Sequence, residues 1–330
     1  MTASAPPANP CEQALAHWCE RWQPGGRAVQ GDMRVAVAYS AGADSTALLL
    51  AAHRRWPGRL TAFHVHHGLQ AAADGFEAQA RAFCTLHGID LHVSRVDAAH
   101  GPGESPEAVA RDRRYATLAS MAQQAGAQVV LLGQHADDQA ETVLLALSRG
   151  SGLPGLAGMA ERFERHGVAF GRPLLAVAAA ELRGWLQASG HAFVDDPTNT
   201  DVRYTRNRIR AVLMPAWDAC FPGFRPMLAR SARHAAQAQT LLDDLARLDL
   251  AQTGEPPAVT ALQALSRARQ ANALRHWLRT CHGVAASAAQ MDELLNQVAD
   301  CRTRGHRIHL KVASGFVVRA GDQLRYTPPI

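Results

Sequence analysis

Residues 33–50, with the sequence MRVAVAYSAGADSTALLL, constrain the fold more than any other stretch of the chain. Val35, Val37 and Tyr39 alternate with small residues, as expected for a buried strand, and a helix is predicted from Thr46 onward. The turn between them, SAGADS, consists of small and hydroxyl-bearing residues, so its backbone can approach an anion closely. A strand, a small-residue turn and a helix in this order are typical of α/β proteins that bind phosphate groups.

Three interpretations of this turn stay open from its residues alone. It is an ordinary strand-to-helix connection with Asp44 as the N-cap, a phosphate-binding turn, or the nucleophile turn of a hydrolase, because residues 38–42 nearly match G-x-S-x-G. The hydrolase motif normally follows several strands, whereas only one strand is predicted up to Ser40. In a phosphate site, Ser40 and Ser45 supply hydroxyl donors and Asp44 meets the phosphates through Mg²⁺. A Walker loop is excluded because it requires G-K-[ST], and the single lysine is Lys311.

The first half of the chain alternates predicted strands and helices, which predicts a doubly wound, mostly parallel sheet. Periodicity places helices at 11–22, 73–87, 106–126 and 137–149, with one beginning at 46, and strands at 60–66, 89–96 and 128–133. Ligands of such sheets bind beyond the carboxyl ends of the strands. Residues 40–45 and 133–138 are both expected at that edge.

The pattern changes after Gly150, where the glycine-rich sequence SGLPGLAG begins. A short strand is predicted at 173–175 and a helix at 181–189, then helices over 211–250 and 259–300 separated by the linker TGEPPA. Three short strands are predicted at 307–311, 315–319 and 323–326. We therefore expect an N-terminal lead and helix (1–32), an α/β domain (33–210), a helical region (211–255) and a small C-terminal α+β domain (256–330).

Composition narrows the class of protein. A chain of 330 residues with 47% hydrophobic content suffices for two or three domains. The net charge of +5 favours an anionic partner, although GC-rich coding produces the same arginine bias. The six cysteines include no C-x-x-C pair, which argues against a disulfide scaffold, a zinc ribbon or an Fe–S cluster. Neither a signal peptide nor an apolar run of ~20 residues is present, so a soluble, cytoplasmic protein is expected.

A second group of polar residues lies in LGQHADDQAET, residues 132–142. His135, Asp137, Asp138 and Glu141 are expected at the end of a strand and in the first turn of the following helix. Acidic residues there also suit a capping box at Asp138-x-x-Glu141 and the helix dipole. The segment by itself therefore leaves a structural role and a catalytic role open.

Six segments together resemble one family. SAGADS resembles the S-G-G-x-D-S signature of the PP-loop ATP pyrophosphatases, with Ala41 in place of a glycine. LGQHADDQAET resembles L-G-H-H-x-D-D-Q-x-E-T of the tRNA(Ile)-lysidine synthetases, a PP-loop branch, with Gln134 in place of the first histidine. Four more segments match that branch in order, namely HVHHGLQ (64–70, departing at His66 and Gln70), ARDRRY (110–115), SRGSGLPGLAGM (148–159) and DDPTNTDVRYTRNRIR (195–210).

The resemblance implies a ligase that acts on the wobble cytidine of the CAU-anticodon tRNA(Ile). The C2 carbonyl oxygen of the cytosine attacks the α-phosphate of ATP and releases pyrophosphate. The ε-amine of L-lysine then attacks C2 and AMP leaves. ATP and Mg²⁺ are the implied cofactors, and tRNA(Ile) and L-lysine are the implied partners. Whether the chain is a monomer or a homodimer stays open, as does the identity of the base that deprotonates the lysine.

The same resemblance assigns roles to individual residues. Catalytic roles fall to Asp44, His135, Asp137, Asp138 and Glu141, of which Asp44 also holds the metal and Asp137 and Glu141 bind the cationic lysine. ATP contacts fall to Ser40, Ala41, Gly42, Ala43, Asp44, Ser45, His67, Arg111 and Gly133. Contacts to tRNA fall to Arg114, Asn199, Arg206, Asn207, Arg208 and Arg210. Two alternatives remain, a PP-loop tRNA thiolase and a catalytically silent RNA-binding protein; pyrophosphate release separates the silent protein from either enzyme.

Overall fold

The computed structural model describes residues 8–22, 33–66, 72–96, 106–195, 201–303 and 305–328, and two predicted site residues, His67 and Asn199, lie outside these ranges. The helices are α1 (Pro10–Arg21), α2 (Ala43–Arg55), α3 (Ala72–His87), α4 (Pro106–Ala125), α5 (Ala136–Ser148), α6 (Leu153–Leu156), α7 (Ala179–Ala188), α8 (Thr205–Arg208), the π-helical turn η3 (Ile209–Leu213), α9 (Met214–Cys220), α10 (Phe224–Thr253), α11 (Val259–Gln263), α12 (Arg267–His282) and α13 (Ala288–Asp300). The strands are β1 (Val35–Ala38), β2 (Leu60–His66), β3 (Asp90–Arg95), β4 (Val129–Leu131), β5 (Arg162–Arg165), β6 (Val168–Gly171), β7 (His309–Val312), β8 (Gly315–Ala320) and β9 (Gln323–Thr327).

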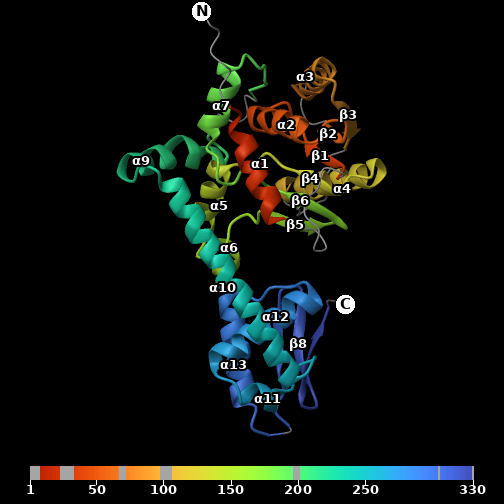
Figure 1. Cartoon of the computed structure of the whole chain (residues 1–330). Helices are drawn as coiled ribbons and strands as arrows, with labels where there is room; N and C mark the ends of the chain where they lie inside the picture. The colour runs from red at the N-terminus through yellow and green to blue at the C-terminus, as the bar shows by residue number, and fades with distance from the viewer. Residues whose placement is uncertain are drawn as a thin grey trace, which may run out of the picture. The chain divides into compact units, whose positions relative to one another are not determined.

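A six-stranded sheet organises the first of two compact units, which ends at residue 233. Its strand order is β3-β2-β1-β4-β6-β5, and every neighbouring pair is parallel except β5 with β6 (Figure 1). The chain moves outward from β1 to β2 and β3 and later, from β4, to the opposite side. The strand order therefore reverses between β1 and β4, and a ligand site is expected in the crevice there. The predicted doubly wound fold is confirmed.

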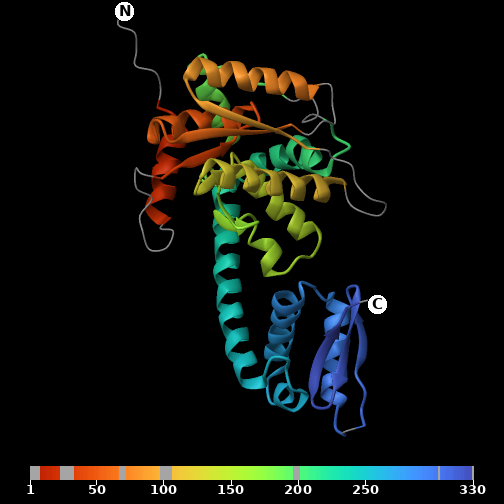
Figure 2. The ribbon, with the colours of Figure 1, turned by 90° about the vertical axis from the view of Figure 1, so that its right-hand side faces the viewer.

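Alternate residues of the central strands enter different cores, because successive side chains of a strand point to opposite faces. Val35 and Leu131 pack in the core beneath α1, α2, α3 and α7, whereas Ala36 and Val130 pack against α4. Figure 2 shows the orange strands β2 and β3 between α3 and α4. Both faces are buried, which explains the continuous apolar run that predicted β4.

The strand predicted at 173–175 is wrong. Leu174 and Leu175 are buried in a turn, and the neighbouring strands are β5 and β6, which form a hairpin. The hairpin turns at His166 and Gly167, whose φ angles of 50° and 72° suit a tight connection between antiparallel strands. The prediction failed because two adjacent buried leucines mark burial without showing whether the backbone pairs with a strand.

The second compact unit comprises residues 234–330. Helices α11, α12 and α13 and the antiparallel sheet β7-β8-β9 surround a core that includes Trp277, Leu278, Met291 and Val317. The three predicted C-terminal strands are confirmed. The boundary between the units falls within α10, and the segment predicted as a linker forms the turn between α10 and α11.

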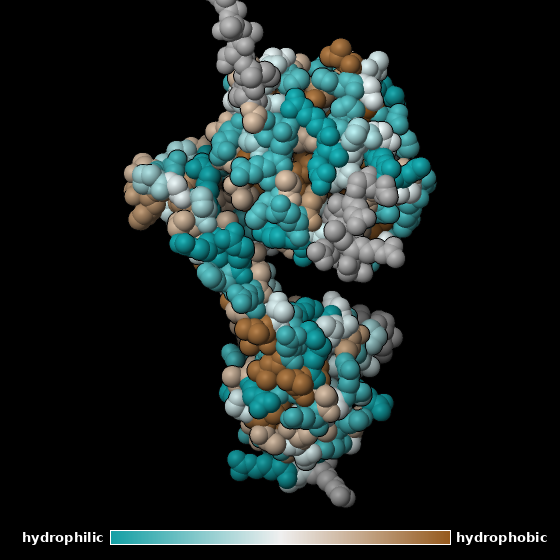
Figure 3. Space-filling view, in the orientation of Figure 1, coloured by the Kyte–Doolittle hydropathy of each residue, from teal (hydrophilic) through white to brown (hydrophobic). Residues whose placement is uncertain are grey.

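The visible surface of each unit is largely hydrophilic (Figure 3). Large exposed apolar side chains nevertheless occur near α9, including Val212 and Phe221, which are 67% and 63% exposed. In the part of the chain that the structure describes, no helix has both the length and the apolar character needed to cross a membrane.

Candidate active site

The loop after β1 is held in place by its own hydroxyl and backbone groups. The Ser45 hydroxyl donates to the Gly42 carbonyl at 3.0 Å and accepts from the Ser40 amide at 3.2 Å, and the Thr46 hydroxyl donates to the same carbonyl at 2.9 Å. Val194 follows α7 in the sequence, and its amide donates to the Ala41 carbonyl at 2.9 Å. These bonds fix the backbone that presents the start of α2.

The N-cap of α2 is Gly42, so the interpretation of Asp44 as an N-cap is wrong. Asp44 lies in the first helical turn, and no described side chain caps the helix. The first amide groups of a helix lack intrahelical partners and carry the positive end of its dipole. The geometry therefore suits an anion at this helix start, as the phosphate interpretation requires.

Ala41 occupies the left-handed region of the backbone, with a φ of 65°. Glycine adopts this conformation without strain, whereas for alanine the contact between Cβ and the backbone raises the free energy by roughly 1–2 kcal/mol. Its methyl group is fully buried in the core beneath α2, and burying one methyl stabilises a protein by about 0.8 kcal/mol. Burial thus offsets much of the strain, which explains how alanine is accommodated at a position where the family signature has glycine.

His135 brings together the two loops at the carboxyl ends of β1 and β4. Its Nε2 atom lies 3.4 Å from Asp44 and 3.5 Å from Asp138, and its Nδ1 atom lies 3.7 Å from Asp137. His135 is also the N-cap of α5 and forms a capping box with Asp138. The capping box expected at Asp138 and Glu141 is therefore shifted by three residues, and four predicted catalytic side chains form one cluster.

Three carboxylates control the protonation of His135. Burial disfavours the imidazolium, but Asp44, Asp138 and Asp137 outweigh it and raise the pKa of His135 to about 8. In the unfolded chain the pKa is near 6.5. Between pH 6.5 and 8 the folded state therefore binds a proton that the unfolded state has released. The resulting stabilisation is complete below pH 6.5 and is lost as the pH rises through 8.

We expect the free energy of unfolding to fall by about 2 kcal/mol between pH 6 and pH 9 because of this one group, in protein without ligands. Urea unfolding at both pH values measures the change. His135→Asn keeps an N-cap acceptor but has no titrating group, so its pH dependence should be flatter by that amount. Equal slopes for the two proteins would contradict the assignment.

The carboxylate of Asp44 has an atom without a protein partner. Its Oδ1 is buried and makes no hydrogen bond among the described residues. No group of three or more His, Cys, Asp or Glu side chains in those residues could hold a metal by itself. Mg²⁺ commonly binds through one or two carboxylates together with substrate phosphates, so the residues present fit that ion.

The structure pairs the other two acidic residues with arginines. Glu141 is fully buried and lies 2.7 Å from Arg210 and 3.6 Å from Arg206. Asp137 accepts from the Ala179 amide at 2.9 Å and from Arg225 at 2.5 Å. Burial raises the pKa of Glu141 despite the arginines, whereas hydrogen bonds from Ala179 and Arg225 outweigh burial and lower the pKa of Asp137. Sequence reasoning missed Arg225, which lies in no motif and 88 residues from its partner.

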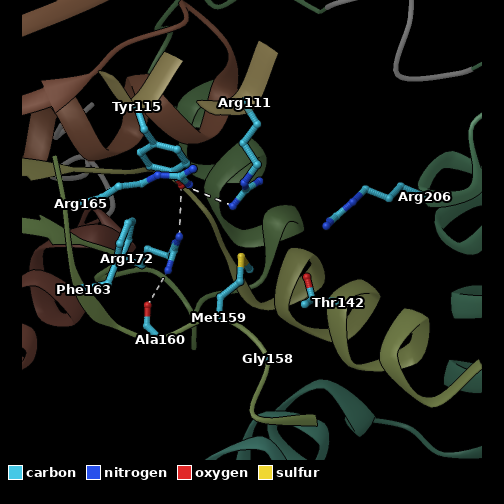
Figure 4. Close-up of a pocket in the computed structure, with 10 residues that line it drawn as sticks. All are labelled: Arg111, Tyr115, Thr142, Gly158, Met159, Ala160, Phe163, Arg165, Arg172 and Arg206. Carbon is cyan, nitrogen blue, oxygen red and sulfur yellow. Dashed lines mark hydrogen bonds between the residues drawn. The ribbon is translucent and has the colours of Figure 1, made fainter. Parts of the chain in front are cut away.

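Predicted ATP and tRNA contacts meet in a separate cavity of about 350 Å³ (Figure 4). Arg111 and Arg206 line it, together with Tyr115, Arg165 and Arg172. No residue of the loop 40–45 is among its lining residues, so the structure groups Arg111 with the predicted tRNA contacts.

Of the remaining predicted tRNA contacts among the described residues, Arg114 lies beside this cavity, Asn207 and Arg208 lie on α8, and Arg210 lies on η3. Arg114 stacks on the Tyr115 ring, with its guanidinium 5.8 Å from the ring centre. Asn207 donates to the Asp201 carbonyl at 2.9 Å, which braces the start of α8. Arg208 is exposed on that helix.

Comparisons with known proteins identify the family. Residues 11–217 match the PP-loop domain, and residues 258–325 match the TilS substrate binding domain. The chain is 62% identical over 291 residues to the tRNA(Ile)-lysidine synthase of Polaromonas naphthalenivorans, which covers 88% of each chain. It is 45% identical over 298 residues to that of Bordetella bronchiseptica, which covers 87% of each.

A solved structure shows the same fold at low identity. The U34-tRNA thiolase NcsA from Methanococcus maripaludis has a TM-score of 0.57 and 16% identity, over 68% of this chain and 77% of that one. A likeness at this identity shows a shared fold and nothing more. The two sequence relatives, in contrast, match regions of both compact units. The chain therefore belongs to the tRNA(Ile)-lysidine synthase family of PP-loop ligases.

Proposed function

We propose that this chain joins L-lysine to C2 of the wobble cytidine of CAU-anticodon tRNA(Ile), using ATP and Mg²⁺ in the cytoplasm. One observation carries the site assignment. Asp44, in the first turn of α2, and His135, the N-cap of α5, follow β1 and β4 and approach to 3.4 Å at the point where the strand order reverses. Ligands of doubly wound sheets bind at such a point.

The adenylation step uses the start of α2. The amides of Gly42, Ala43 and Asp44 and the hydroxyls of Ser40 and Ser45 are arranged around the turn that would hold the phosphates of ATP. Fixed donors cost no reorganisation when charge develops on the leaving pyrophosphate. The cytosine oxygen, a poor leaving group, becomes a good one once it carries the adenylate.

Asp44 would hold Mg²⁺ through Oδ1, which has no hydrogen-bond partner among the described residues, and Asp138 approaches the same Nε2 atom of His135 as Asp44 does. The ion neutralises phosphate charge when it is bound. His135, largely protonated at neutral pH, places a further positive charge beside the same carboxylates. It is therefore better suited to donate a hydrogen bond than to accept the proton of lysine.

Asp137 and Glu141 are our candidates for binding the lysine ammonium. Both already contact guanidinium groups, so a substrate ammonium has to share a carboxylate with an arginine or take the arginine's place. Glu141 offers Oε2, which is buried and forms no hydrogen bond among the described residues. Its raised pKa also makes Glu141 a more capable proton acceptor than an ordinary carboxylate.

For tRNA, we assign the arginines around the cavity, on α8 and on η3. Arg114, Arg206, Arg208 and Arg210 provide positive charge on one unit, and neutralising phosphates is the main source of affinity for RNA and DNA. The second unit, which matches a substrate binding domain, would hold another part of the tRNA. The target cytosine must leave its stack to reach the adenylating phosphate.

Ala41→Gly should change the free energy of unfolding by less than about 1 kcal/mol, because relief of backbone strain offsets loss of a buried methyl. Pyrophosphate release should stay within a few-fold of wild type. Urea unfolding and a pyrophosphate assay measure both quantities. A rate increase well beyond this range would show that strain at Ala41 limits catalysis.

Incorporation of radiolabelled lysine into tRNA tests the proposed function directly. The expected result is label on tRNA(Ile) that depends on both ATP and Mg²⁺. ATP-dependent pyrophosphate release without label would retain adenylation and exclude lysine as the second substrate. Neither signal from folded protein would support the silent RNA-binding alternative.

A further inference from the structure

Arg172 is a buried cation that sequence reasoning did not select. It follows β6 directly and is 5% exposed. Its guanidinium donates to three oxygens: Nε to Gln134 Oε1 at 2.6 Å, Nη1 to the Ala160 carbonyl at 2.7 Å, and Nη2 to the Tyr115 hydroxyl at 3.2 Å. Figure 4 shows the last two bonds, with Arg172 lying between Ala160 and Tyr115.

The three acceptors belong to three separate regions of the chain. Tyr115 ends the segment ARDRRY on α4, Gln134 precedes His135 in the loop after β4, and Ala160 follows the glycine-rich segment 148–159. The acceptors lie 57, 38 and 12 residues from Arg172 in the sequence. One planar side chain therefore contacts all three regions, and it adds to the two bonds by which Gln139 of α5 already holds Met159.

The surroundings of Arg172 are unusual for a residue that only adds stability. None of the ion pairs found among the described residues involves it, and its charge is met by three oxygen dipoles and by the Phe163 ring at 4.1 Å. Burial of a charge without a carboxylate is costly. An apolar side chain of similar volume would often stabilise such a core more, so the guanidinium calls for another explanation.

We propose that Arg172 is a positioning residue of the ligation reaction. It holds three parts in one arrangement: the loop that contains His135, the glycine-rich segment, and Tyr115 at the cavity of Figure 4. The proposal rests on the function proposed above. It also accounts for Gln134, which stands where the family signature has histidine. The glutamine presents an oxygen to Arg172 Nε, and a neutral histidine can accept a bond at the same place through a ring nitrogen.

A first experiment does not depend on the reaction. The full chain is digested with trypsin, and mass spectrometry follows cleavage after Arg149 and Arg162, which lie on either side of the glycine-rich residues 151–158. Loss of the Ala160 bond in Arg172→Met should loosen the segment before Arg162 and speed cleavage there by roughly 10-fold, whereas the two bonds between Gln139 and Met159 remain. Arg172→Lys should behave similarly, because one ammonium cannot reproduce the planar fork. Arg162→Lys, on the exposed strand opposite Gly171, keeps the cleavage site and should show no change.

The second experiment separates positioning from folding. Arg172→Met should lower the rate of pyrophosphate release on the order of 10²-fold. Gln134→Leu should lower the rate, Gln134→His should retain most of it, and the double variant Arg172→Met, Gln134→Leu should be no slower than Arg172→Met alone. Additive losses, or losses that simply follow the unfolded fraction, would overturn the proposal.

If Arg172→Met does not fold, the comparison of Gln134→Leu with Gln134→His decides alone, since both variants leave Arg172 in place. Equal rates for these two variants would also overturn the proposal. Failure of wild type to attach lysine would instead count against the proposed function, while the trypsin result would still report on the connection that Arg172 makes.

Discussion

Asp44→Asn should reduce pyrophosphate release by roughly 10²–10³-fold, the loss typical when one charged or hydrogen-bonding group at a transition state is removed. Asparagine keeps the size of the side chain but removes the charge that would hold Mg²⁺. Because Asp44 Oδ1 has no protein partner among the described residues, the structure contains no bond at that atom for the change to break. The folded protein should survive the substitution but lose part of the stabilisation that the raised pKa of His135 provides near neutral pH, because Asp44 Oδ2 lies 3.4 Å from His135 Nε2.

Two measurements make this prediction specific. Asp44 contributes to the raised pKa of His135, so the NMR titration of His135 should move to lower pH in Asp44→Asn. Asp90→Asn, which removes the same charge at an exposed position in β3, should affect neither the titration nor the rate. Unchanged pyrophosphate release in Asp44→Asn would remove Asp44 from metal binding, whatever the titration shows.

Gly133→Ala should impair both stability and catalysis, because the loop after β4 touches the start of α2. A Cβ atom at position 133 would lie 3.1 Å from the Ser45 nitrogen and 3.2 Å from the carbonyl carbon of Asp44. These are backbone atoms of the helix start that would cradle phosphate, so they cannot move aside as a flexible side chain could. We expect a loss of about 1–3 kcal/mol in the free energy of unfolding.

Displacement of the helix start should also slow pyrophosphate release on the order of 10²-fold. Gly184→Ala is the matched control, since a Cβ there meets no atom within 4 Å and the residue lies inside α7. That variant should gain roughly 0.5–1 kcal/mol from better helix propensity and keep its activity. A fully active Gly133→Ala protein would show that the close approach of the two loops is not needed for the reaction.

The sequence determined the four parallel strands β1 to β4 and the location of the site, but not the β5–β6 hairpin. Strict alternation in β1 and the continuous apolar run of β4 follow from burial on both faces, and the small-residue turn marks the start of α2. These are local signals, because each depends on residues that are neighbours in the chain. The same locality let the motif residues Asp44 and His135 be assigned to the carboxyl ends of their strands.

Tertiary structure decided which of these residues meet. The pairing of Asp137 with Arg225 and of Glu141 with Arg210 joins charges 88 and 69 residues apart. Sequence alone assigned the two acids to lysine and Arg210 to tRNA, and it did not select Arg225. The same is true of Arg172, whose three acceptors come from different elements. Partner choice among charged groups depends on distance and burial in the folded chain, and neither quantity is encoded by a local pattern. The sequence by itself thus specified the fold and the chemistry of the site, while folding determined which charges neutralise one another.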